Sequence, residues 1–153
     1  MSDWDATLAD LQRRRDRSTA MGGADRLAAH GSDGKLDARA RVTRLLDDGS
    51  FREIGTLVGG DIPADGIIAG SGTIDGNPVM VGAEDFTTMA GTIGTGSNAK
   101  RYRIAELAVR NKIPMVMLLE GAGFRPGSHG GRSPIDLIGQ ARCSGIVDRK
   151  SVV

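Results

Sequence analysis

Residues 113–131 read Ile113-Pro-Met-Val-Met-Leu-Leu-Glu-Gly-Ala-Gly-Phe-Arg-Pro-Gly-Ser-His-Gly-Gly131. The six residues from Met115 to Glu120 are typical of a buried parallel strand, because they form a short apolar run that stops at an acidic residue. The glycine-dense loop that follows lets backbone N–H groups approach a ligand with no Cβ in the way. Such a loop can hold negative charge on oxygen without a side-chain catalyst. On spacing alone, an oxyanion or phosphate cradle and a tight turn with no ligand fit this segment equally well.

The composition narrows the class of protein. Glycine accounts for 23 of 153 residues, about twice the usual share of roughly 7%, so loops built from backbone groups are expected. A net charge of +1 argues against nucleic acid as the main partner. Cys143 is the only cysteine, which excludes an internal disulfide and a zinc site built on paired cysteines. With no 18-residue apolar run and an acidic N-terminus, we expect a cytoplasmic protein and no membrane partner.

The apolar periodicity predicts the order of helices and strands. Helices are expected at 3–17, 37–47, about 98–111 and about 134–144, with a short helical piece near 25–29. Strands are expected at 67–74, 78–83 and 113–119, with an edge strand at 51–57. Asp75-Gly76 predicts a type I′ hairpin between the first two of these strands. The strand at 78–83, the helix after it and the strand at 113–119 form a βαβ unit, whose two strands should be parallel.

Two other motifs invite a functional interpretation that their spacing does not support. Gly70-Ser-Gly72 resembles half of a dinucleotide fingerprint, but its spacing is wrong and a hairpin follows it instead of a helix. Ser128, His129 and Asp136 could form a hydrolase triad, but a nucleophile and base adjacent in sequence are poorly placed for a mutual hydrogen bond. No Gly-x-Ser-x-Gly elbow is present.

For Glu84-Asp85 and for His30, the sequence favours a structural role over a catalytic one. Glu84-Asp85 ends a strand at the edge where ligands bind parallel sheets, yet neighbours on an extended chain point apart. We therefore predict that these carboxylates cap the next loop rather than act as an acid–base pair. His30 is predicted to lie on the surface.

The residues resemble the amino-terminal half of the biotin-dependent acyl-CoA carboxyltransferases, a family that includes the β-type subunits of acyl-CoA carboxylases and methylmalonyl-CoA carboxyltransferase. Four segments in family order carry the resemblance, across about residues 25–147. They are Gly34–Phe51 for the entry helix, Asp65–Gly76 for the hairpin, Ala83–Gly94 with Lys100 for the substrate loop, and Leu118-Leu-Glu-Gly-Ala-Gly-Phe-Arg125 for the family's Asp-Ser-Gly-Gly-Ala-Arg stretch.

The resemblance implies an α/β fold, specifically a crotonase-like spiral of ββα units. It implies an N-terminal helical segment at 1–50, a partial carboxyltransferase domain at 51–147 and a tail outside the family at 148–153. It also implies biotin carried on a partner, the biotin carboxylase or biotin carrier subunit, and a homo-oligomer in full-length members. In the family, carboxybiotin releases CO2, biotin takes the α-proton of the acyl-CoA, and backbone N–H groups hold the enolates.

Site residues follow from the same resemblance, position by position. The backbone N–H groups of Gly123 and Phe124 match the Gly-Ala pair that stabilises an anion. Substrate contacts are implied at Gly91, Thr92, Gly94, Lys100, Gly121, Ala122 and Arg125. No metal is implied. Phe124 stands where alanine is usual, which leaves the N–H intact but adds bulk beside the acyl group.

The end of the chain departs from the family. After Val147 the family continues to a second glycine pair that completes the site, whereas this sequence reads Asp148-Arg-Lys-Ser-Val-Val153. We therefore expect a truncated member that is inactive and marginally folded alone. A non-catalytic remnant or assembly module, and a crotonase-type acyl-CoA hydrolase or decarboxylase, remain as alternatives. The absence of a zinc ribbon favours the propionyl-CoA class.

Overall fold

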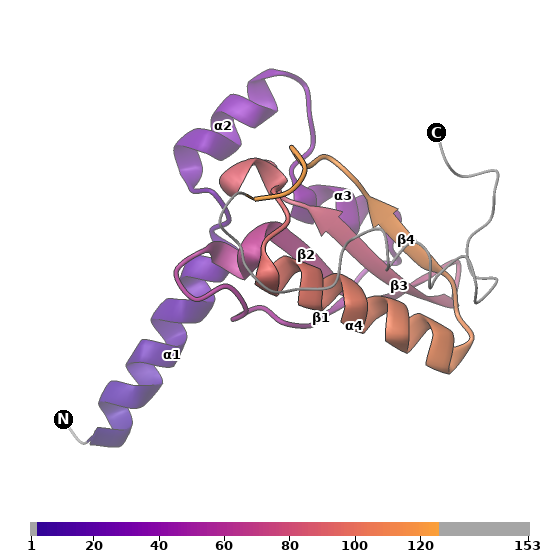
Figure 1. Ribbon diagram of the computed structural model, residues 1–153, viewed down its shortest axis with the longest axis horizontal. Helices are drawn as coiled ribbons and strands as arrows, with labels where there is room; N and C mark the ends of the chain where they lie inside the picture. Colours follow the sequence, from indigo (N-terminus) through magenta and orange to yellow (C-terminus); the bar gives the residue numbers. More distant parts are fainter. Residues whose placement is uncertain (1–2, 126–153) are drawn as a thin grey trace.

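The computed structural model describes residues 3–125, which form a mixed α/β arrangement around a four-stranded sheet of order β1-β2-β3-β4 (Figure 1). The helices are α1 (Asp3–Thr19), α2 (Ala24–Ser32), α3 (Ala38–Leu45) and α4 (Thr95–Asn111), with 3-10 turns η1 (Pro63–Gly66) and η2 (Met89–Gly91). The strands are β1 (Arg52–Glu53), β2 (Ile67–Ile74), β3 (Asn77–Glu84) and β4 (Met115–Leu118). The predicted α/β class is confirmed, while the predicted helix at 134–144 and the tail at 148–153 lie outside the described residues.

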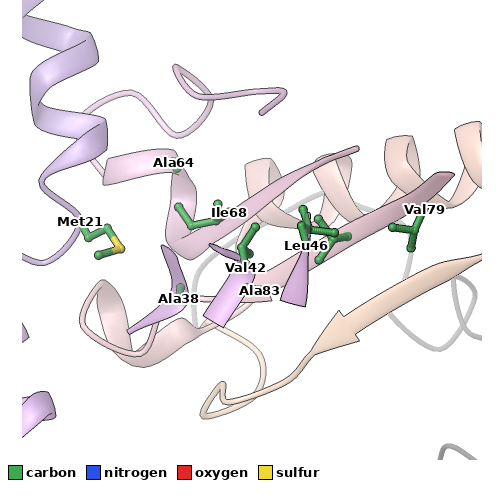
Figure 2. Packing of buried hydrophobic residues seen from close by; sticks show 9 residues of the cluster. Met21, Ala38, Val42, Leu46, Ala64, Ile68, Val79 and Ala83 are labelled. Atoms are coloured by element: carbon green, nitrogen blue, oxygen red, sulfur yellow. The ribbon is translucent and has the colours of Figure 1, made fainter. Parts of the chain in front are cut away.

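The centre of the sheet is covered by a helix on each face. Alternate residues of β3, such as Val79 and Val81, pack with Val42 of α3 in one apolar cluster (Figure 2). Met80, between them, packs with Ile104 of α4 in a second cluster. Since successive side chains of a strand point to opposite faces, a strand covered on both sides must be apolar throughout. This explains the nearly continuous apolar run of β3.

The predicted hairpin between β2 and β3 is confirmed. Asp75 and Gly76 have φ angles of 50° and 77°, the positive values that a type I′ turn requires, and Ile74 pairs with Asn77 across the turn. The carboxylate of Asp47, two residues beyond α3, accepts hydrogen bonds from the Asp75 and Gly76 N–H groups (both 2.9 Å) and from the Thr73 hydroxyl (2.5 Å). Asp47 thus fixes the hairpin to the end of α3.

The predicted βαβ unit is also confirmed, with two corrections. β3 and β4 are parallel, from the pair Met80–Met115 to the pair Ala83–Leu118. β4 is half-buried within the described structure rather than buried, because it lies at the edge of the described sheet. α4 begins at Thr95, three residues earlier than expected, because the Asp65 carboxylate accepts the Ser97 N–H at 2.6 Å. That cap comes from η1, and the Ser97 hydroxyl adds a local one by accepting the Gly94 N–H at 2.7 Å.

The edge strand predicted at 51–57 is shorter than expected. β1 comprises only Arg52–Glu53, which pair with Ser71 and Gly70. A Cβ at Gly70 would collide with the carbonyl oxygen of Arg52, and one at Gly72 would lie 2.6 Å from Leu46 Cδ1. Gly70-Ser-Gly72 is therefore a packing motif within a hairpin strand, in agreement with the rejection of a nucleotide loop.

The N-terminal helices differ in how they contact the sheet. α3 packs on it, and its N-cap Asp37 accepts the Ala40 N–H at 2.9 Å. α1 projects away and touches the body through its C-terminal end (Figure 1), where the Ser18 hydroxyl donates to Thr56 O at 2.6 Å. Trp4 is therefore 68% exposed. In residues 3–125, no helix combines the length and apolar character needed to cross a bilayer.

The Asp47 contacts predict a specific acid sensitivity. The Thr73 hydroxyl first, and then the Gly76 N–H, lower the pKa of Asp47 from its ordinary value of 3.8. A lowered pKa contributes stability that is present above pH 3.8 and is lost as the pH falls through the lower value. We expect Asp47→Asn to show a smaller loss of stability than the unsubstituted chain as the pH falls below about 4. Urea unfolding followed by circular dichroism measures this, with Asp48→Asn as the exposed neighbouring control. An unchanged acid dependence in Asp47→Asn would contradict the assignment.

Candidate functional site

Two loops meet where the parallel strands β3 and β4 end. Ile93, after β3, forms a parallel bridge with Phe124, after β4. Its N–H donates to Gly123 O at 2.8 Å, and its carbonyl accepts the Arg125 N–H at 2.9 Å. Ala122 N–H donates to Ala90 O at 2.9 Å. These bonds fasten the glycine-rich loop of residues 119–125 against the loop of residues 85–94.

Two glycines allow this contact. A Cβ on Gly121 would lie 2.5 Å from Gly91 O, and a Cβ on Gly91 would lie 3.0 Å from Gly121 Cα. Gly91 also has φ +62°, a conformation that side chains other than glycine's disfavour. The glycine excess identified in the sequence therefore serves, at these two positions, to bring two backbones together.

A buried carboxylate holds the start of the glycine-rich loop. Glu84, the last residue of β3, accepts the N–H of Glu120 at 2.5 Å and that of Gly121 through the same oxygen, Oε2. Its Oε1 accepts from Arg101 Nη2 at 2.6 Å, and both side chains are almost fully buried. The sequence predicted that Glu84 would cap the loop that directly follows it, which is wrong, because its carboxylate reaches the loop after β4 instead.

Asp85 does cap the next loop, as predicted. Its carboxylate accepts the Thr87 N–H at 3.0 Å and the hydroxyls of Thr87 and Thr88, each at 2.5 Å. The two adjacent carboxylates therefore point to different loops. This arrangement favours the capping interpretation over an acid–base pair.

The hydrogen bonds of the loop leave two consecutive amides available. The N–H groups of Glu120 and Gly121 bind Glu84, and those of Ala122 and Arg125 bind backbone carbonyls. In a parallel bridge centred on Phe124, its own N–H points away from Ile93. Among residues 3–125, neither Gly123 N–H nor Phe124 N–H has an acceptor, and both residues are exposed. These are the two amides that the resemblance selected.

The Glu120 carboxylate lies among basic groups from α2, α3 and the segment between them. Its distances are 3.1 Å to Arg41 Nη2, 3.5 Å to His30 Nε2 and 3.6 Å to Lys35 Nζ. His30 is buried and stacks on Phe86, with 6.1 Å between ring centroids, so the predicted surface position of His30 is wrong. Its burial depends on residues 56 and 90 positions later, which periodicity does not reveal.

A cavity of about 480 Å³ borders this cluster. Arg26, His30 and Lys35 supply basic groups to its lining, and Phe86 supplies an aromatic face. Lys35 Nζ lies 5.8 Å from the centre of the Phe86 ring. Ala90, which binds the glycine-rich loop through its carbonyl, also lines the cavity. The cavity lining and the backbone contact with the glycine-rich loop therefore share one residue, Ala90.

Arg125 is anchored inside the protein. Its guanidinium contacts Asp65 Oδ1 at 2.5 Å and donates to Thr92 O at 3.0 Å and to the Thr92 hydroxyl at 3.2 Å. A Cβ on Gly94 would collide with this guanidinium. Thr92, Gly94 and Arg125, three of the substrate residues expected from sequence, thus come together with Asp65 behind the loop.

Lys100 lies in the core rather than on a ligand-facing surface. Its ammonium donates to Ile67 O at 2.5 Å and to Ala64 O at 3.1 Å, and the residue is 3% exposed. Burial lowers the pKa of Lys100 to about 8. Its charge is used to satisfy backbone carbonyls at the η1–β2 junction. Ser128, His129 and Asp136, the rejected triad, lie outside the described residues.

The chain matches a known family of protein domains. Residues 29–140 match the model of the carboxyl transferase domain. The chain belongs to the carboxyl transferase domain family. The matched residues include the cavity lining from His30 onward, Glu84 and the whole glycine-rich loop.

Named relatives point to the same family. The chain is 33% identical over 128 residues to the carboxyltransferase subunit of propionyl-CoA carboxylase from Haloferax mediterranei, covering 77% of this chain and 25% of that one. It is 35% identical over 134 residues to the methylmalonyl-CoA carboxyltransferase 12S subunit of Propionibacterium freudenreichii subsp. shermanii, covering 81% and 26%. The chain thus spans about a quarter of the length of these curated relatives.

Solved structures agree with the sequence relatives. The transcarboxylase 12S hexamer with methylmalonyl-CoA bound superposes with a TM-score of 0.77 at 30% identity, covering 94% of this chain and 30% of that one. A single-chain, multi-domain long-chain acyl-CoA carboxylase superposes with a TM-score of 0.74 at 32% identity, covering 86% and 15%. The fold is therefore that of part of a carboxyltransferase.

Lys100 predicts an alkaline effect on stability. Between pH 8 and its ordinary pKa of 10.5, unfolded Lys100 keeps a proton that the folded chain has lost, so folding is favoured as the pH rises. We expect the free energy of unfolding of the unsubstituted chain to rise relative to that of Lys100→Met from pH 7.5 to about 10. Paired urea titrations measure the difference, and Lys112→Met, at an exposed position, serves as control. A pH-independent difference for Lys100→Met contradicts the prediction.

The Asp65 anchor predicts a loss of stability. Asp65→Asn keeps one acceptor oxygen but removes the negative charge that Asp65 places against the largely buried Arg125 guanidinium, which should destabilise the chain by about 3 kcal/mol. Asp61→Asn is the matched control, because Asp61 pairs with Arg17 at 2.7 Å while its side chain is 99% exposed. Exposed pairs contribute about 1 kcal/mol or less. Equal effects of the two substitutions on chemical denaturation would refute an anchoring role for Asp65.

Proposed function

We propose that the chain forms the acyl-CoA-binding part of a biotin-dependent carboxyltransferase, which moves a carboxyl group onto the α-carbon of an acyl-CoA. The observation that supports this most strongly is the pair of exposed N–H groups at Gly123 and Phe124, which have no acceptor in residues 3–125. The family match places these residues in a carboxyl transferase domain. Two adjacent donors suit a single oxygen that becomes negatively charged.

The chemistry explains why backbone donors are sufficient. Removing the α-proton of a thioester sends the electron pair toward the carbonyl, so the enolate carries its negative charge on oxygen. Donors that are already fixed in place stabilise that charge without reorganising, and loss of one such donor typically slows a reaction by about 10²–10³-fold. Biotin on a carrier protein would supply the carboxyl group as CO2 and, once that group has left, the site that accepts the α-proton. The contribution of this chain would be to orient the thioester and stabilise its oxygen.

The remaining candidate residues would shape the site rather than react. Gly91, Gly121 and Ala122 set the backbone contact between the loops, while Thr92, Gly94 and Arg125 support the loop from behind. We do not place Lys100 against the substrate, because its ammonium already binds two carbonyls in the core. The Phe124 side chain, 56% exposed beside the donor pair, would limit the size of the acyl group.

The cavity at Phe86 would hold the nucleotide end of CoA. Arg26 and Lys35 would face phosphate charges, with Asp33 as the acidic group of the lining, and the Phe86 face suits a purine ring. Since Ala90 belongs both to the cavity lining and to the loop contact, one elongated molecule could occupy the cavity and reach the donor pair.

Complete turnover would require more protein than the segment matched here. The matched relatives are about four times as long as the matched segment, and transcarboxylase 12S forms a hexamer. We propose that a biotin carrier and further carboxyltransferase domains, in an assembly of copies, complete the site. Turnover by the 153-residue chain alone with carboxybiotin and acyl-CoA would overturn this part of the proposal.

The donor pair predicts a backbone signature of substrate binding. Titrating the ¹⁵N-labelled chain with propionyl-CoA should shift the Gly123 and Phe124 amide protons downfield more than free CoA does, because only the thioester supplies a carbonyl oxygen. Phe124→Ala should keep this response, since the amide remains. Gly123→Ala should lose it, because Gly123 has φ +97°, which an L side chain disfavours.

Three outcomes would count against the proposal. No saturable binding at millimolar propionyl-CoA would favour a non-catalytic remnant or assembly module. Hydrolysis of the thioester during the titration would favour a crotonase-type hydrolase. Thioester shifts that fall on side-chain resonances and spare these two amides would reject the backbone donor pair.

A further inference from the structure

We propose that Glu84 is a positioning residue of the site: its buried carboxylate fixes the start of the glycine-rich loop so that the Gly123 and Phe124 amides, which have no acceptor in residues 3–125, face the substrate oxygen. This inference rests on the proposed function for its catalytic meaning. The positioning itself can be measured without any substrate.

The carboxylate of Glu84 is shared between a helix and the loop. Oε1 contacts Arg101 Nη2 of α4 at 2.6 Å, and Oε2 accepts the N–H groups of Glu120 and Gly121. The Glu84 side chain is 7% exposed and that of Arg101 is 5% exposed. Charge-assisted hydrogen bonds in a site of low polarity are stronger than neutral ones. Arg101 therefore holds the carboxylate in the orientation that receives both loop amides.

A second arginine connects the loop to α3. Arg41 Nη2 donates to the backbone carbonyl of Glu84 and lies 3.1 Å from Glu120 Oε2. Glu84 is thus held from α4 by Arg101 and from α3 by Arg41, on the two faces of the sheet. The loop that carries the donor pair is tied to both covering helices through one residue at the end of β3.

The charge of Glu84 matters as well as its shape. An ionised carboxylate only accepts hydrogen bonds, and here it receives them from one guanidinium and two backbone amides. A glutamine of the same shape has one accepting oxygen and one donating NH2 group. Whichever way the amide is turned, its NH2 group faces either Arg101 or the loop N–H groups. A glutamine therefore cannot satisfy both sides.

The burial of Glu84 argues against a direct acid–base role. Both carboxylate oxygens are already bonded within the described residues, and the donors are themselves fixed by helix and loop. A group that exchanges protons with substrate must reach the reacting atom directly or through one water. Glu84 instead reaches the loop backbone, so it acts on the reaction through the placement of Gly123 and Phe124.

The test compares Glu84→Gln with Glu53→Gln in the ¹⁵N-labelled 153-residue chain. Glu53 is a suitable control because it forms a part-buried pair with Arg39, at 2.7 and 3.1 Å, on β1 and away from the loop. Glu84→Gln should speed hydrogen exchange at Glu120 and Gly121 by about tenfold and weaken propionyl-CoA binding by about tenfold. Exchange at Val81, in the middle of β3, should stay unchanged. Glu53→Gln should leave unchanged the exchange at Glu120 and Gly121, the binding of propionyl-CoA and the exchange at Val81.

Two further measurements keep the inference open to refutation if Glu84→Gln does not fold. The double variant Glu84→Ala/Arg101→Met leaves no unpaired buried charge and should show the same local exchange increase. In the unsubstituted chain, NMR coupling across the hydrogen bonds should connect the amides of Glu120 and Gly121 with the Glu84 carboxylate carbon. Absence of that coupling overturns the inference, as does unchanged exchange at Glu120 and Gly121 in a folded variant.

The outcomes also separate this inference from the proposed function. Local exchange that responds to Glu84→Gln, in a chain that does not bind propionyl-CoA, supports the positioning and rejects the function. Normal propionyl-CoA binding by the unsubstituted chain and by Glu84→Gln, together with unchanged exchange at Glu120 and Gly121, supports the function and rejects the positioning.

Discussion

The contact between the Glu84 carboxylate and the first amides of the glycine-rich loop is the interaction on which the site depends. It joins the end of β3 to the segment after β4, and Arg101 sets its orientation from within α4. Without a fixed start, the loop would not hold the Gly123 and Phe124 amides in a defined position. The bridge between Ile93 and Phe124 then fixes the far end of the same loop. Once both ends of the loop are bonded, the Gly123 and Phe124 N–H groups have no acceptor in residues 3–125.

Features encoded by neighbouring residues could be predicted from the sequence. Asp75-Gly76 specified the hairpin because both residues adopt positive φ at little cost. The apolar run from Met115 and the helix before it specified a parallel βαβ unit because short connections leave few alternatives. The donor pair at Gly123 and Phe124 came from resemblance to a family, and the hydrogen bonds of the loop are consistent with it.

Features that depend on contacts between residues far apart in the sequence could not be predicted. Asp65 caps a helix 32 positions later, so α4 begins before its apolar stripe does. Lys100 lies on a polar part of α4, so its sequence context predicts exposure. Its ammonium is buried because it donates hydrogen bonds to two carbonyls at the η1–β2 junction. His30 is buried only because Phe86 and Glu120 lie beside it. The sequence shows that an acidic residue, Glu84, ends a strand. The prediction paired its carboxylate with the loop after β3, whereas the carboxylate binds the loop after β4.

The most direct measurement is a crystal structure of the chain with a bound acyl-CoA. The thioester oxygen should lie about 2.7–3.1 Å from both the Gly123 and the Phe124 nitrogen atoms, with Glu84 still bound to the amides of Glu120 and Gly121. A thioester oxygen bound elsewhere, or Gly123 and Phe124 amides that donate to the protein's own carbonyls, would contradict this prediction.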